Sequence, residues 1–260
     1  MKISTIRERP ASKKYIRWLM AGLWILIWQG LYWFVGEDLL LSSPWTVLTR
    51  FIALAQTGDF WAAVTRSCLG ILTGFLGGVA AGFLLGALTF RFPVFYEFIR
   101  IPMNLLKAVP VASFIILTML WISSRNLPVL ISLIMVLPLV WTNVDQGFRK
   151  TDRELLEVAE VFRLPASKII RYVYYPAVAP FLRSACRVAL GFAWKAGIAA
   201  EIIVTPIGFI GKKLYDAKVT LETADMFAWT AVVILLSVCF EKVINLILDH
   251  LPGNRGGETS

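Results

Sequence analysis

Long apolar runs, separated by short charged segments, dominate this sequence. A helix needs about 20 apolar residues to cross the hydrocarbon core of a bilayer. Inside that core every backbone N–H and C=O must be bonded internally, and helices achieve this by themselves. With 58% hydrophobic residues and a mean hydropathy of +0.70 over 260 residues, the chain is expected to be an integral membrane protein. The predicted fold is all-α, with about six transmembrane helices in one domain.

Six runs are long enough to be membrane spans. We expect these spans at about residues 15–35, 67–90, 101–122, 128–148, 177–204 and 227–248. Between them, we expect residues 37–65 along the outer surface, 91–100 as a short cytoplasmic turn and 205–226 as an outer loop.

The third run is interrupted by Pro102 and Pro110, with Asn104 and Lys107 between them. A broken helix with polar residues is tolerated in a membrane where it lines a cavity or packs against protein. Asn104 and Lys107 are therefore candidate pathway-lining residues.

Positive charge favours an arrangement with both termini in the cytoplasm. The inner segments of the six-span arrangement hold sixteen Lys and Arg residues and the outer segments hold five, as the positive-inside rule requires. A signal peptide would also begin with basic residues, but the first run is too long and no small-residue cleavage site follows it. We expect a cytoplasmic basic N-terminus at 1–14, a transmembrane domain at 15–250 and a polar cytoplasmic tail at 251–260, in the plasma or inner membrane. This topology accounts for the net charge of +9, and no nucleic-acid partner is expected.

The second run carries a glycine at every fourth position. These glycines are Gly70, Gly74, Gly78, Gly82 and Gly86. The spacing places them on one helix face, and small residues allow two helix backbones to approach closely in lipid. Five glycines in register favour a packing seam over a helix that is merely rich in glycine.

A charged, amphipathic stretch, TDRELLEVAEVFRLPASKIIRYVYYP, lies between two apolar runs at residues 151–176. Thr151 and Glu154 have the spacing of a capping box, and apolar residues from Leu155 to Phe162 recur at helical spacing. Pro165 is expected to end this helix and to begin a second, basic one that ends near Tyr174. Two short helices joined at a proline turn indicate a docking surface rather than a lipid contact.

This stretch resembles the cytoplasmic EAA loop of permease subunits from binding-protein-dependent ABC importers. The family pattern is E-A-A, three residues, Gly, nine residues, Ile, one residue and Leu-Pro. At that spacing the chain has Glu157, Val158 and Ala159, then Arg163 at the glycine position, then Val173, Tyr175 and Pro176. Pro165 is expected to supply the break in place of glycine. The resemblance implies that residues 149–176 form an ATPase-coupling loop, with Phe162 on its apolar face.

The resemblance covers most of residues 60–250. The TRS…TGF, LGFAWKAGIAAE and IGKKLYDAK segments are similar to the nitrate, sulfonate and taurine group of these permeases. It implies the MetI-like fold of type I importers and a pathway formed by two permeases, as a homodimer. Two ATPase subunits would dock on the coupling loops, and an extracytoplasmic binding protein would deliver a small solute, which could be anionic. The chain itself would bind no cofactor, because ATP and Mg²⁺ would bind to the ATPase.

No catalytic or metal-binding constellation is present in the sequence. His250 is the single histidine and has no partner motif, and the three cysteines lie singly inside apolar runs. The GFIGKK segment at 208–213 lacks the spacing and the Ser/Thr of a phosphate-binding loop. The chain is therefore not expected to be an enzyme, and ATP hydrolysis would occur in a separate subunit.

The fifth run is the most polar: it holds Lys195 and Glu201, and Lys195 lies deeper than the arginines near the cytoplasmic end. An ionisable residue inside a membrane is a functional candidate by default, so both are candidate pathway-lining residues, with a purely structural pair as the alternative. In a rival class, an ion-coupled secondary transporter, Lys195, Glu201 and Asp145 would form a relay, but no inverted repeat is visible. A third class, a membrane scaffold without transport, would not need charges in this run.

Overall fold

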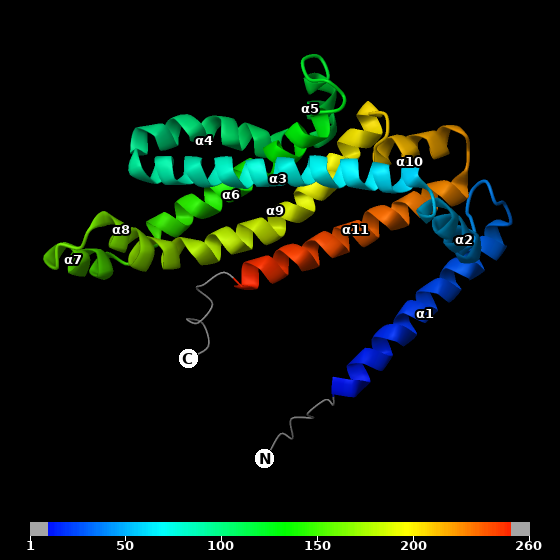
Figure 1. Cartoon of the computed structure of the whole chain (residues 1–260), viewed down its shortest axis with the longest axis horizontal. Coiled ribbons are helices and arrows are strands. Elements are labelled where there is room, and N and C mark those ends of the chain that lie inside the picture. Colours follow the sequence, from blue (N-terminus) through cyan, green and yellow to red (C-terminus); the bar gives the residue numbers. More distant parts are fainter. Residues whose placement is uncertain (1–9, 251–260) are drawn as a thin grey trace.

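The computed structural model describes residues 10–250 (Figure 1). Most of the predicted basic N-terminus 1–14 and all of the predicted tail 251–260 lie outside the described residues. Every regular element within 10–250 is helical, which confirms the all-α fold. The elements are α1 (Pro10–Val35), α2 (Pro44–Ala55), α3 (Gly58–Arg91), α4 (Pro93–Ala108), α5 (Val111–Thr118), α6 (Leu127–Arg149), α7 (Arg153–Val161), α8 (Ala166–Ile169), the π-helix η1 (Ile170–Tyr174), α9 (Tyr175–Val204), α10 (Ile210–Val219) and α11 (Thr223–His250).

Four described helices are long and apolar enough to cross a membrane, namely α1, α3, α6 and α11. The bent pair α4 and α5 would add a fifth span. The expected span at 177–204 lies within α9, which has the required length. It is not among the four because its charged residues are spread along its length, whereas the other spans keep an apolar run nearly free of charge.

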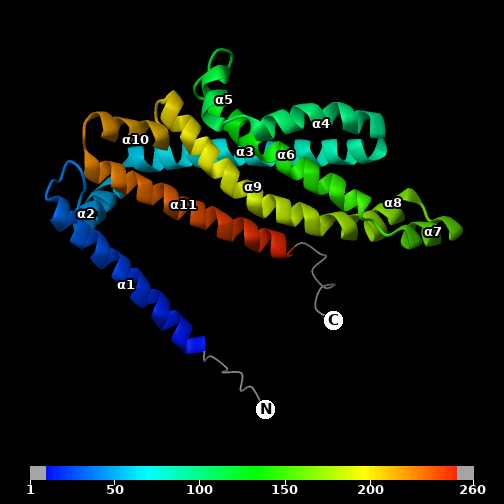
Figure 2. The ribbon, with the colours of Figure 1, turned by 180° about the vertical axis from the view of Figure 1, so that it is seen from behind.

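The predicted cytoplasmic turn at 91–100 is wrong. Only Phe92 separates α3 from α4, because its extended backbone (φ −123°, ψ 97°) reverses the chain and Pro93 then starts the next helix. Residues 101–122 are also not a straight span, since α4 and α5 meet at an angle of 105°. The break falls at Pro110, whose ring cannot donate a backbone hydrogen bond. The reversal at Phe92 lays α4 back along α3 (Figures 1 and 2).

Two predicted outer segments contain helices of their own. Residues 37–65 hold α2 and the first part of α3, which starts at Gly58 rather than near residue 67. The hydroxyl of Thr57 caps α3 by accepting from the backbone N–H of Phe60. Residues 205–226 hold α10, so the predicted loop there is largely helical.

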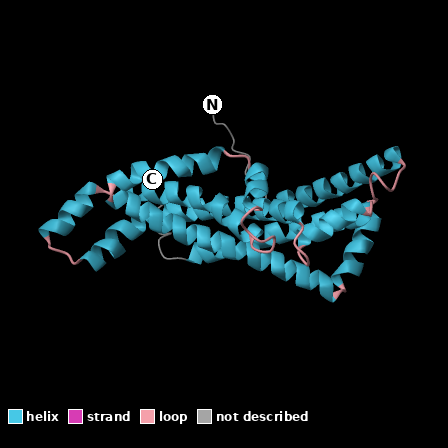
Figure 3. Cartoon of the chain, turned by 90° about the horizontal axis from the view of Figure 1, so that it is seen from above, coloured by secondary structure: helices cyan, strands magenta, loops and turns pink. Residues whose placement is uncertain are grey.

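Three long helices form the centre of the bundle. Helix α6 packs against both α3 and α9, and α11 also contacts α9 (Figure 1). Figure 3 shows that the described residues form helices joined by loops and turns. Helix α1 diverges from the bundle below α2 in Figures 1 and 2, and its apolar span has no buried residue. One contact that holds it is a hydrogen bond from the indole N–H of Trp28 to the carbonyl of Ser42 at 3.2 Å.

Glycines of α3 lie against the backbone of α6. A Cβ added at Gly78 would lie 2.7 Å from Val136 Cβ, and one at Gly82 would lie 2.8 Å from Val140 Cβ. Gly74 and Gly86 make equally close approaches to α6, whereas a Cβ at Gly70 would reach only ordinary contact at 3.8 Å. The seam therefore uses four of the five predicted glycines.

We expect Gly78→Ala to destabilise the protein by about 1–3 kcal/mol, because the added methyl group must push α3 away from Val136 and α6. Gly70→Ala is the matched control on the same helix face and should be neutral, since its methyl group has room. Thermal unfolding of the detergent-solubilised variants measures both. Equal stability of the two variants would show that the helices are not held at this distance.

Candidate functional site: the segment that joins α6 to α9

The segment between α6 and α9 protrudes at one end of the molecule, here called the α7 end (Figure 1). Helix α10 and the start of α11 lie at the opposite end, the α10 end (Figures 1 and 2). Helix α6 ends at Arg149, and α7 follows after a connection of three residues. The predicted loop at 149–176 is thus a compact helical turn.

Helix α7 is capped by Asp152, not by Thr151 as the sequence predicted. The carboxylate Oδ1 of Asp152 accepts from the backbone N–H of Glu154 at 2.9 Å, and Asp152 has the extended backbone of a capping residue. Thr151 is buried instead, and its hydroxyl has no hydrogen-bond partner within the described part of the chain. The boundary is shifted by one residue because aspartate and threonine can serve the same capping role.

Helix α7 ends at Val161, and the chain turns at Arg163, where the family pattern has glycine. Arg163 adopts the left-handed backbone (φ 46°) that glycine adopts most easily. Its N–H donates to the carbonyl of Glu160 at 2.9 Å, and the N–H of Leu164 donates to the carbonyl of Ala159 at 2.9 Å. These two bonds form a Schellman motif. The prediction that Pro165 replaces the glycine break is therefore wrong: Arg163 makes the turn, and Pro165 precedes α8.

The second basic helix does not end near Tyr174, as the sequence predicted. Helix α8 continues through η1 into α9, so the chain is helical from Ala166 to Val204. Val173 is buried, and the ring of Tyr174 packs against Phe90 of α3 and Phe148 of α6. The turn is therefore joined to α9 by continuous helix.

An apolar patch remains exposed on α7 and its cap. Phe162 is 73% exposed, and Leu155 and Val158 are each 50% exposed, whereas Ala159 is buried within the chain. Glu157 and Arg163 are exposed beside this patch. Contiguous exposed apolar side chains with a charged edge are typical of a protein-binding surface.

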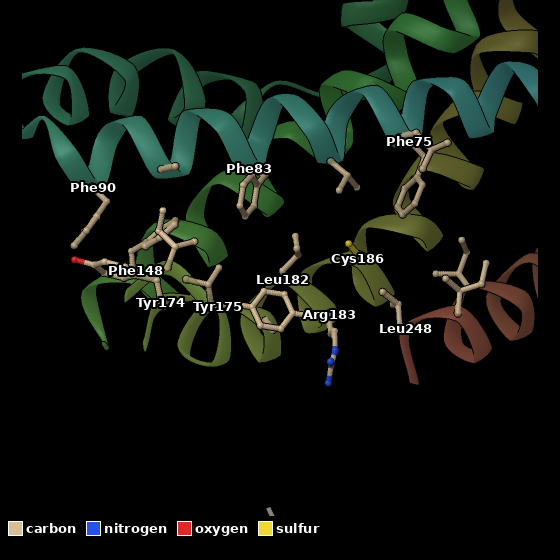
Figure 4. A pocket seen from close by; sticks show the side chains of 18 of the residues that line it. Phe75, Phe83, Phe90, Phe148, Tyr174, Tyr175, Leu182, Arg183, Cys186 and Leu248 are labelled. Atoms are coloured by element: carbon tan, nitrogen blue, oxygen red, sulfur yellow. The ribbon is translucent and has the colours of Figure 1, made fainter. Parts of the chain in front are cut away.

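An apolar cavity of about 800 Å³ lies next to the junction of η1 and α9 (Figure 4). Aromatic and aliphatic side chains of α3, α9 and the end of α11 line it, among them Phe83, Leu182 and Leu248. Arg91 and Arg183 are the charged residues in this lining. A site for a small hydrophilic solute needs several convergent polar groups, so this cavity does not have the chemistry of a solute site.

The four candidate pathway residues lie in different surroundings. Lys195 is exposed on α9, and Asn104 and Lys107 are exposed on α4. The ammonium group of Lys107 donates to the hydroxyl of Thr142 at 2.8 Å. Glu201 is completely buried at the end of α9, so its carboxylate does not line an open surface of this chain.

The three charges proposed for a relay do not form one. Asp145 accepts from Arg149 Nε at 2.7 Å and from the hydroxyl of Thr89 at 3.2 Å, between α3 and α6. Glu201 accepts from Ser67 and from Gly211. Sequence reasoning missed Thr89 and Ser67 because they lie 56 and 134 positions from the carboxylates that they bind. For Glu201, only the glycine at 211 hints at a close approach.

With this geometry in place, comparison with known proteins identifies the family. Residues 78–252 match the family described as binding-protein-dependent transport system inner membrane component. The chain belongs to this family. It is a multi-pass membrane protein and a permease, as the resemblance at the EAA-like loop implied.

Three relatives carry names from the same group of permeases. A Bacillus subtilis permease protein named for aliphatic sulfonates transport (SsuC) is 27% identical over 93% of this chain and 89% of its own. The bicarbonate transport system permease protein CmpB of Synechococcus elongatus is 30% identical over 74% of this chain and 66% of its own. The nitrate import permease protein NrtB of Synechocystis is 25% identical over 92% of this chain and 87% of its own.

Solved ABC transporters share the fold of the permease. A crystal structure of an amino acid ABC transporter with histidines matches with a TM-score of 0.60 at 14% identity, over 78% of this chain and 97% of that chain. A bacterial alginate ABC transporter, in complex with an alginate pentasaccharide-bound periplasmic protein, matches with a TM-score of 0.54 at 14% identity, over 94% of this chain and 96% of that one.

The left-handed backbone at Arg163 generates a prediction for the permease. Arg163→Gly should strengthen the end of α7 by about 1–2 kcal/mol, since an L-residue is strained in this region. Arg163→Val should weaken it, because a β-branched side chain is poorly tolerated at positive φ. Amide hydrogen exchange of residues 153–162 reports both changes. Equal protection in the two variants would contradict the Schellman turn.

Proposed function

We propose that the permease forms, with a second copy of itself, the pathway of an ATP-dependent importer. A separate ATPase docks on the α7 end, and an extracytoplasmic binding protein delivers a small anionic solute to the α10 end. Both termini and the α7 end lie on the cytoplasmic side, in agreement with the excess of Lys and Arg in those segments. ATP and Mg²⁺ bind to the ATPase and not to the permease.

The observation that carries this proposal is the exposed apolar patch of Leu155, Val158 and Phe162 on a rigid turn. Apolar side chains at this distance from the spans have no lipid to cover them, so a partner protein accounts for their exposure. The helix that follows the turn is unbroken as far as Val204. Closure of a docked ATPase would therefore move α9 as a rod.

The second copy accounts for the exposed face of α9. Lys195 lies there between exposed Phe192 and Ile202, and a Cβ at Gly191 would meet nothing within 4 Å among the described residues. A lysine exposed to hydrocarbon costs about 2.5–3.5 kcal/mol at mid-membrane. A pathway between two copies avoids this cost, and a cation there suits the anions for which the relatives are named.

The carrier alternative has less support. Its relay requires Lys195, Glu201 and Asp145 to exchange protons, yet Asp145 is bonded to Arg149 and Glu201 is bonded within a separate cluster. It also leaves the exposed patch of α7 without a role.

The docking surface predicts that Val158→Asp will prevent the ATPase from co-purifying with the permease. A charge in the centre of an apolar contact, or truncation of Phe162 to Ala, should cost more than about 1–2 kcal/mol of binding, whereas a rim charge costs less. Glu160→Ala is the matched control, because Glu160 is also exposed on α7 but is polar. Pull-down from membranes and solute uptake measure the effect, with permease abundance determined separately. Normal co-purification and uptake for Val158→Asp would overturn the docking role.

A second prediction concerns Lys195. Lys195→Met should leave membrane insertion intact and lower uptake about ten-fold, as expected when a charged hydrogen-bond partner worth roughly 1.5–3 kcal/mol is lost. Lys195→Arg should retain uptake, and Lys242→Met on α11 controls for loss of an exposed lysine elsewhere. Uptake into reconstituted vesicles decides the matter. Parental uptake by the Met variant would assign Lys195 a structural role only.

A further inference from the structure

Glu201 connects three helices at the α10 end of the permease. It lies in the last turn of α9 and is completely buried. Its Oε2 accepts from the hydroxyl of Ser67 on α3 at 2.8 Å and from the backbone N–H of Gly211 on α10 at 2.9 Å. The hydroxyl of Ser67 in turn accepts from the N–H of Ile210 at 3.0 Å. One carboxylate and one hydroxyl thus hold α10 against α3 and α9.

The start of α10 depends on these two side chains. Its own N-cap residue, Phe209, makes no side-chain cap bond. The first N–H groups of a helix have no partner inside the helix, and in α10 those of Ile210 and Gly211 donate to Ser67 and Glu201. A carboxylate at this end also interacts favourably with the positive end of the helix dipole. The cap of α10 is therefore supplied entirely by other helices.

The backbone of α10 touches the backbone of α9 at Gly211. A Cβ at Gly211 would lie 2.6 Å from the backbone nitrogen of Ile202, and closer still to Glu201 itself. Any side chain at 211 would force the two helices apart. Gly211 thus allows the carboxylate of Glu201 to reach the start of α10.

The second carboxylate oxygen, Oε1, is buried and has no hydrogen-bond partner within the described residues. The hydrogen bonds from Ser67 and from Gly211 both go to the other oxygen, Oε2. A glutamine oxygen could accept the same two bonds, while its amide nitrogen took the place of Oε1. This contact between α9 and α10, here called the joint, needs a hydrogen-bond acceptor at the end of a side chain as long as that of Glu201. Among the described residues, no cation pairs with the negative charge of the carboxylate.

We propose that Glu201 is a positioning residue that joins α10 rigidly to α9, so that movement of the outer α10 segment reaches the ATPase-docking turn. The path is continuous, because α9 runs through η1 and α8 to that turn without a break. This inference rests on the proposed function, in which the binding protein acts at the α10 end. It assigns Glu201 to coupling between the α10 end and the α7 end rather than to contact with the solute.

The test compares two conservative variants of Glu201 in the assembled complex of permease and ATPase. Glu201→Gln keeps the reach and an acceptor oxygen but removes the charge. Glu201→Asp keeps the charge but is one methylene too short to reach both Ser67 and Gly211. The readouts are the basal ATPase rate and its stimulation by the system's binding protein, with taurine, nitrate and bicarbonate each offered as solute.

We expect Glu201→Gln to keep stimulation within about two-fold of the parent, and Glu201→Asp to lose about ten-fold or more, the range set by a buried polar group left unpaired. Basal hydrolysis and ATPase co-purification should stay at parental levels in both. Retained stimulation in both variants, or loss in both, would refute the joint. Failure of the Gln variant to accumulate in membranes would refute it as well, since that variant keeps both contacts.

Gly211→Ala provides an independent variant that leaves α9 unchanged. Its methyl group pushes α10 off the backbone of Glu201 and should reproduce the loss of stimulation seen with Glu201→Asp. Gly70→Ala is the matched control. If the parental complex shows no ATPase co-purification or stimulation, the proposed function fails. If the parent is stimulated and Gly211→Ala is stimulated equally, only the joint fails.

Discussion

The close approach of α3 and α6 determines how the rest of the bundle is placed. Lipid offers no hydrophobic force between helices, so their association depends on tight van der Waals contact between small residues. Glycines of α3 bring its backbone against the Val136 and Val140 region of α6. Helix α9 then packs closely on both helices, because Gly197 lies against Ile71 of α3 and Ser132 of α6. Any loosening of the first contact would therefore displace α9, the helix that links the two ends of the molecule.

Two buried carboxylates of this bundle accept hydrogen bonds from neighbouring helices. Asp145 bonds to Thr89 and Arg149, and Glu201 bonds to Ser67 and the start of α10. Unpaired polar groups in hydrocarbon are costly, and the bonds from Ser67 and Gly211 lower the cost of burying Glu201 in α9. The hydrogen bonds of both carboxylates also fix the relative position of α3, α6, α9 and α10, so the same contacts that stabilise the fold give it mechanical continuity.

The membrane class, the helical fold and the family followed from local sequence patterns. Long apolar runs predict membrane helices because length and composition alone decide whether a segment can span a bilayer. The fourfold spacing of Gly74, Gly78 and Gly82 places them on one face whatever the partner helix is. The segment around Glu157 and Ala159 keeps the spacing of the family even though Arg163 replaces its glycine. Each of these signals depends on residues that are close together in the chain.

The tertiary structure decided features that involve distant residues or a choice between similar local options. Sequence could not tell whether Thr151 or Asp152 caps α7, because either side chain can accept the capping hydrogen bond. It also could not tell that Arg163, rather than Pro165, would turn the chain by taking a left-handed backbone. It could not fold α4 back along α3 or set the angle between α4 and α5, since both depend on packing. Nor could it pair Glu201 with Ser67, 134 positions away. The sequence by itself determined the long apolar helices and the family to which they belong. Only the packed structure determined which charges are buried, because burial depends on the neighbours that distant segments bring.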